Sequence, residues 1–85
     1  MTLTANERAA LQGIVDSNYH DGQHPVDNWV WSWSANPWID DDTQRRKFAG
    51  TLTSLIKKGF AKQDGDGVGA CVAITQSGYD ALNSN

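Results

Sequence analysis

The chain has 85 residues, enough for one small domain with a modest hydrophobic core. Seven lysines and arginines stand against ten aspartates and glutamates, and the net charge of −3 argues against a protein that coats nucleic acid indiscriminately. A single cysteine, Cys71, excludes an internal disulfide, and no apolar run approaches the length of a membrane span. We therefore expect one domain, residues 1–85, in the reducing cytoplasm, without a membrane partner.

The charges are segregated along the chain. Residues 1–42 hold seven acids and one base, residues 43–62 hold six bases and no acid, and residues 63–85 hold three acids and no base. A solvated helix face is the commoner explanation of a charge run. The absence of acids over the whole middle segment instead favours a surface that meets a polyanion.

The N-terminal segment predicts a helix followed by a turn. Thr4 and Glu7 have the spacing of a capping box, and apolar residues at helical spacing then extend the helix over about residues 5–18. The next stretch, NYHDGQHP, is rich in turn residues. It contains His20 and His24 but no clearly placed third ligand, so we expect no metal site.

Four tryptophans follow in VDNWVWSWSANPWI. The alternation of Trp29, Trp31 and Trp33 with smaller residues is typical of a strand with an aromatic face, whereas Asp27 would be suited to cap a short helix. We predict a short irregular strand or turn followed by a short helix. Two or three of the tryptophans are expected to fill the core, and any exposed one is a candidate interface anchor.

The segment DTQRRKFAGTLTSLIKKGF predicts the central helix of the domain. Asp42 or Thr43 is suited to be its N-cap and Gly59 to end it, which gives a helix over residues 43–58. Four apolar residues at helical spacing predict a buried stripe. They are Phe48, Leu52, Leu55 and Ile56.

The polar side of this helix is the candidate binding surface. Basic residues in its first turn oppose the helix dipole, at a cost of a few tenths of a kcal/mol each. A phosphate partner would explain them, and small residues in the middle would let the backbone approach it closely. The candidate contact residues are Arg45, Arg46, Lys47, Gly50, Thr53, Ser54, Lys57 and Lys58.

The C-terminal part predicts a β-hairpin over residues 60–74 and a final helix over residues 76–82. Alternating strands flank the turn DGDGVG, and Thr75 is suited to cap the helix. The turn resembles a calcium loop, but its twelfth position is Thr75, where a bidentate glutamate is required, so we reject calcium. Tyr79 and Leu82 should face inward.

This order of elements resembles a winged helix-turn-helix domain, similar to the multiple-antibiotic-resistance regulator family and to small phage or plasmid proteins. The matching motifs are Leu55-Ile56, Lys58-Gly59-Phe60 and Ile74-Thr75-x-x-Gly78. The resemblance implies an α+β fold: a three-helix core with a C-terminal hairpin wing and a short final helix.

Under this resemblance, the recognition helix maps onto residues 43–58 and the wing tip onto residues 64–69. Two departures stand out. The family's wing usually carries a base for the minor groove, whereas this tip offers Asp64 and Asp66, and the family's long dimerising helices are missing.

The sequence leaves two functional classes open. One is a transcriptional or mobile-element regulator that binds double-stranded DNA with its basic helix in the major groove. The other is a protein-interaction module or inhibitor that uses exposed tryptophans and acidic patches. We expect no enzyme activity, because no nucleophile or acid–base pair is recognisable, and no cofactor. We expect a monomer or a weak homodimer.

Overall fold

Residues 3–20 and 22–84 of the computed structural model form a small α+β fold of four α-helices, one 3-10 helix and three strands. The predicted fold class is therefore confirmed at the α+β level. In chain order the elements are α1 (Ala5–His20), β1 (Val30–Trp31), α2 (Ser32–Ala35), α3 (Lys47–Lys57), β2 (Ala61–Asp64), the 3-10 helix η1 (Gly67–Gly69), β3 (Cys71–Ile74) and α4 (Gln76–Asn83).

The predicted capping box starts α1. The Glu7 amide donates to Oγ1 of Thr4 at 3.1 Å, and the Thr4 amide donates to Oε1 of Glu7 at 2.9 Å, so each side chain satisfies a free amide of the first turn. The helix continues to His20, two residues beyond the prediction. A turn at Gly22 then follows as expected, while Asp21 lies outside the described residues.

The strands form one antiparallel sheet in the order β1-β3-β2. β2 and β3 make the predicted hairpin, with Ala61 opposite Ile74 and Asp64 opposite Cys71. Thr75 caps α4 as predicted, because its Oγ1 accepts the Gly78 amide at 3.1 Å.

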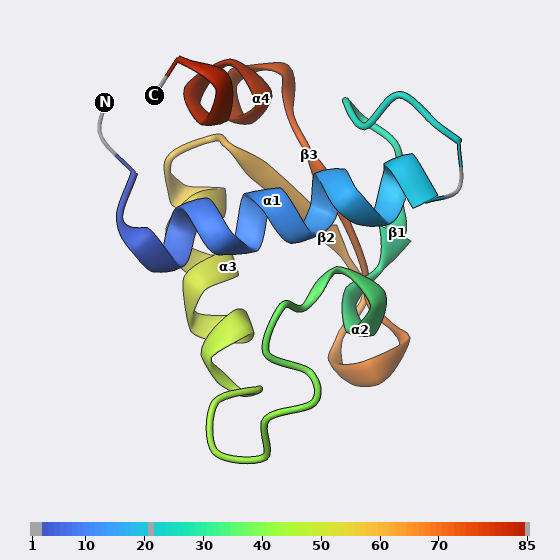
Figure 1. Ribbon diagram of the computed structural model, residues 1–85, viewed down its shortest axis with the longest axis vertical. Coiled ribbons are helices and arrows are strands. Elements are labelled where there is room, and N and C mark those ends of the chain that lie inside the picture. The colour runs from blue at the N-terminus through green and yellow to red at the C-terminus, as the bar shows by residue number, and fades with distance from the viewer. Residues whose placement is uncertain (1–2, 21, 85) are drawn as a thin grey trace.

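The core lies where α1 crosses α3 and the inner face of the sheet (Figure 1). Leu52 and Leu55 are buried at its centre, as predicted. Leu82 of α4 is buried too, whereas Tyr79 is only partly buried. Ile56 is 40% exposed, so its assignment to the buried stripe was wrong. It sits at the margin of the apolar side of α3, where its side chain stays largely open to solvent.

The start of α3 corrects a second prediction. The helix begins at Lys47 and not at Thr43. Asp41 is responsible, because its carboxylate accepts hydrogen bonds from the amide and hydroxyl of Thr43 and from the side chain of Gln44. Such local bonds compete with helix formation and hold the preceding residues in turns. Neither Asp42 nor Thr43 is the N-cap, whereas Gly59, with φ +78°, does end the helix as expected.

The tryptophans correct a third prediction. A short strand and a short helix form as expected, but Trp29, Trp31 and Trp33 are 48%, 52% and 52% exposed. Only Trp38 packs against the core, partly buried. The inward positions of this segment are taken by smaller residues such as Val30, so the alternation points the large rings outward.

Within the described residues, no helix is both long enough and apolar enough to cross a membrane.

Candidate nucleic-acid interface

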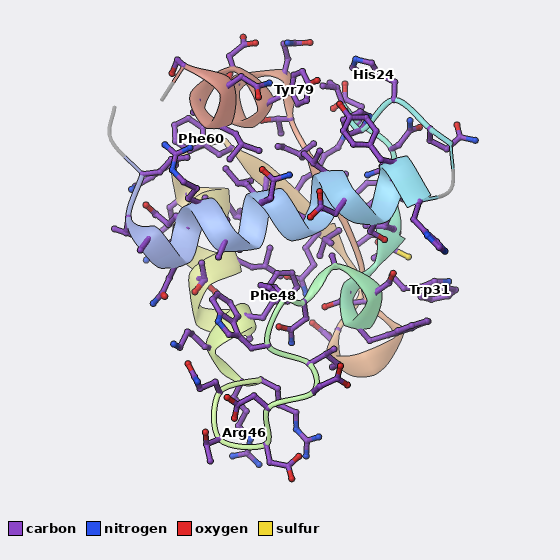
Figure 2. The ribbon with its side chains drawn as sticks, viewed as in Figure 1. His24, Trp31, Arg46, Phe48, Phe60 and Tyr79 are labelled. Atoms are coloured by element: carbon purple, nitrogen blue, oxygen red, sulfur yellow. The ribbon has the colours of Figure 1, made fainter. Side chains whose placement is uncertain are left out.

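An exposed stripe runs along the outer side of α3 and the turn before it. Its members are spaced four, three and four residues apart, which places them on one side of a helix. They are Arg46, Gly50, Thr53 and Lys57, and all four are exposed. Figure 2 shows Arg46 at the far end of the molecule from Tyr79 and His24, where it points into solvent. We call these four residues the outer stripe.

Two further predicted bases lie beside the outer stripe with partners of their own. Arg45 forms an ion pair with Asp42 at 3.2 Å. Lys47 donates to the Gln44 side chain at 2.7 Å, and its ammonium lies 5.2 Å from the centre of the Trp38 ring. Both groups sit at the surface, where such contacts are weak and a phosphate can compete for them.

The remaining two predicted residues, Ser54 and Lys58, face α1 instead. Ser54 donates to Oε2 of Glu7 at 2.6 Å, and Lys58 donates to Oε1 at 2.8 Å. Glu7 is only 3% exposed, so a buried carboxylate neutralises Lys58 within the fold. The structure thus separates these two residues from the outer stripe. The capping-box glutamate is the one signal in the sequence that pointed to this arrangement.

The environment of Glu7 keeps its carboxylate charged. Burial by itself raises the pKa of Glu7, but hydrogen bonds from Lys58, Ser54 and the Thr4 amide, with the Lys58 charge, outweigh burial and lower the pKa from 4.5 to about 2. At neutral pH the Lys58 charge is therefore fully balanced by Glu7.

Among the described residues, no contact explains the glycine at position 50. A β-carbon added to Gly50 would meet no atom within 4 Å, although glycine inside a helix costs about 1 kcal/mol relative to alanine. Gly13 of α1 is the opposite case, because its β-carbon would lie 2.0 Å from the Ala35 carbonyl oxygen. Gly13 is required by helix packing, and Gly50 is not.

A groove of about 460 Å³ adjoins the outer stripe. Arg45 and Arg46 line one side of it, Phe48 and Leu52 contribute apolar surface, and Trp33 of α2 also lines it. Residues from three separate segments, 32–39, 45–52 and 63–67, build the groove, so no single local pattern could have predicted it.

The other candidate chemistry of the sequence is not assembled into a site. His24 accepts the Val26 amide at 3.3 Å through Nδ1, and its ring lies 5.5 Å from that of Tyr79. Among the described residues, no three histidines, cysteines or acids gather in a way that could hold a metal ion.

Comparison of the chain with protein-family models, with curated proteins and with solved structures found no match.

Proposed function

We propose that this chain is a winged-helix protein that binds double-stranded DNA through the outer stripe of α3, as a transcriptional or mobile-element regulator. The order of elements supports this proposal, since a helix, a short strand and two helices precede the β2–β3 hairpin. The sheet order β1-β3-β2 supports it too, because the hairpin is extended by the strand that follows α1. In this arrangement α3 takes the place of the recognition helix and residues 64–69 the place of the wing tip.

The observation that most strongly supports this proposal is Gly50, a glycine that lies between the exposed bases Arg46 and Lys57 and that no contact among the described residues requires. Arg46 and Lys57 are eleven positions apart, about 16 Å along a helix axis. The major groove is about 12 Å wide, so a helix whose axis is inclined across it would bring the two side chains to phosphates on its two edges. Gly50 lies between them and leaves room for the helix backbone to approach the groove, a role that accounts for a glycine with no internal packing partner.

The acidic tip of the β2–β3 hairpin limits the number of phosphate contacts that the protein can make. Asp64 and Asp66 are exposed, and phosphates repel them. Binding then depends on α3 and its preceding turn, with few phosphate contacts. We expect modest affinity that falls as salt rises.

The test is the salt dependence of binding to a duplex, measured by fluorescence anisotropy. The double variant Arg46→Gln/Lys57→Gln removes two positive charges from the outer stripe. Each lost phosphate contact flattens the slope of log affinity against log salt by about 0.9, so the double variant should lose about two units of slope.

A charge-matched control separates local contacts from net charge. Gln23→Glu/Ser77→Glu also makes the protein two charges more negative, at exposed positions after α1 and in the first turn of α4. We expect the control to bind with the wild-type slope. The proposal fails if wild type does not bind duplex at low salt, or if the control loses as much slope as the outer-stripe variant.

A further inference from the structure

The sheet has a second face, opposite the one that packs against α1 and α3. The register places Trp31 opposite Cys71 and Cys71 opposite Asp64, so these three residues form a row across the strands. Because side chains alternate along a strand, Lys62 and Ala73 lie on this same face two residues along, where Ala73 itself is fully covered. We call this the outer face of the sheet.

One end of the outer face already holds a cation between an aromatic ring and a carboxylate. The Lys62 ammonium lies 5.3 Å from the centre of the Trp29 ring and 3.1 Å from a carboxylate oxygen of Asp27. Ring and carboxylate attract the same positive charge, one through the π-face and the other through its charge. The outer face thus holds a cationic side chain between an aromatic ring and a carboxylate.

The neighbouring row offers the same two groups without a cation. The Trp31 ring is 52% exposed and Asp64 is exposed, and in the described part of the chain Asp64 forms no ion pair and no base lies over Trp31. Two strand spacings separate their backbones, about 10 Å, and an extended arginine side chain laid over Cys71 would contact both.

The surroundings of Trp31 give such a side chain a place to anchor. Trp29 and Trp31 border a hollow of about 280 Å³ that Ser17 and Ser34 also line. Figure 2 shows the Trp31 side chain projecting away from the body of the protein. Tryptophan is one of the residue types enriched among those that dominate the energy of protein interfaces.

We propose that the outer face binds a protein partner through a segment that carries arginine or lysine, with the cationic side chain laid across Cys71 between the Trp31 ring and the Asp64 carboxylate. The excess of negative charge on the outer face favours a cationic segment as its partner. The face presents Asp27 and Asp64, its one base is already engaged by Asp27, and phosphates would be repelled. This surface includes no residue of α3, so it is additional to the proposed DNA contact and does not depend on it.

The test follows the tryptophan indole N–H signals by NMR during titration with two capped peptides, Gly-Arg-Leu-Arg-Gly and Gly-Glu-Leu-Glu-Gly. We expect the arginine peptide to shift the Trp31 and Trp29 signals saturably, with a Kd below about 1 mM. The glutamate peptide should shift neither. Trp38, which packs against the core, should not move with either peptide and reports that the fold is intact.

Two variants locate the binding. Asp64→Asn should weaken the arginine peptide about fivefold, while Asp80→Asn, which removes an exposed acid from α4, should leave it unchanged. Trp31→Ala should abolish the Trp29 shift, and because Trp31 is half exposed the variant should still fold.

Four outcomes would overturn the proposal. The arginine peptide could produce no saturable shift, or the two aspartate variants could weaken binding alike. Oligothymidylate could shift Trp31 where the arginine peptide does not, which would assign the face to nucleic acid. The Trp31 signal could instead move on dilution of the protein alone, which would assign it to a second copy of the chain.

Discussion

The two polar sides of α3 carry similar residues in different surroundings. On the side toward α1, Ser54 and Lys58 are held by the buried carboxylate of Glu7. On the outer side, Arg46 and Lys57 are exposed, and no ion pair engages them within the described residues. One helix thus uses some of its polar groups to build the fold and leaves others free.

The difference shows why a run of bases overstates a binding surface. Six bases lie between residues 43 and 62, but Lys58 is neutralised from α1 and Lys62 is engaged by Asp27 and Trp29. What remains for a polyanion is the outer stripe with Arg45 and Lys47 beside it. Counting charges along the sequence does not distinguish these groups, because their partners come from other elements.

The strongest test of the orientation of α3 compares two apolar residues. Leu52→Ala should destabilise the fold by about 2–5 kcal/mol, because Leu52 is 2% exposed and its loss leaves a cavity. Ile56→Ala should cost less than about 1 kcal/mol, since Ile56 is 40% exposed. Thermal melts followed by circular dichroism would measure both. Equal losses of melting temperature would mean that α3 packs in another orientation.

Low pH should weaken the contact between α1 and α3, because it protonates the Glu7 carboxylate that joins the two helices. The pKa of Glu7 is lowered to about 2 from 4.5, so its contribution to stability is complete above about pH 5 and disappears as the pH falls toward 2. The shift corresponds to about 3 kcal/mol. Urea unfolding at several pH values would show the loss for wild type.

The matched variant for this measurement is Glu7→Gln. It keeps the size of the side chain but removes the charge, so it should be less stable than wild type at pH 7 and should lose less further stability between pH 5 and pH 3. If wild type and Glu7→Gln respond to acid equally, Glu7 does not hold α3 as the structure indicates.

The smallest effect on stability should come from Gly50→Ala, and the informative result is whether the variant is more or less stable than wild type. Gly50→Ala should raise stability by up to about 1 kcal/mol, or a few degrees in melting temperature, because the added methyl group meets open space. The same variant should weaken duplex binding if the backbone approaches DNA there. Gly13→Ala is the control and should be destabilising, because its methyl group would collide with the Ala35 carbonyl. Loss of stability in Gly50→Ala would point to an internal role for that glycine.

Several elements of the fold could be predicted because their signals are local. Thr4 and Glu7 are three residues apart, and so are Thr75 and Gly78, so the bonds that start α1 and α4 depend on nearby atoms only. The hairpin is similarly local, since a short glycine-rich turn separates its two strands. Such bonds form in any context that leaves the segment helical or extended, and the sequence is therefore sufficient to predict them.

The orientation and surroundings of each residue were decided by the tertiary structure. The aromatic alternation predicted a strand at Trp31 but not that its ring would face solvent, because that depends on which side of the sheet α1 covers. The capping box placed Glu7 at a helix start, yet its bonds to Ser54 and Lys58 span 47 and 51 residues. Long-range packing selects one partner among many of similar chemistry, and for this reason the division of α3 into a fold-building side and a free side appears only in the folded chain.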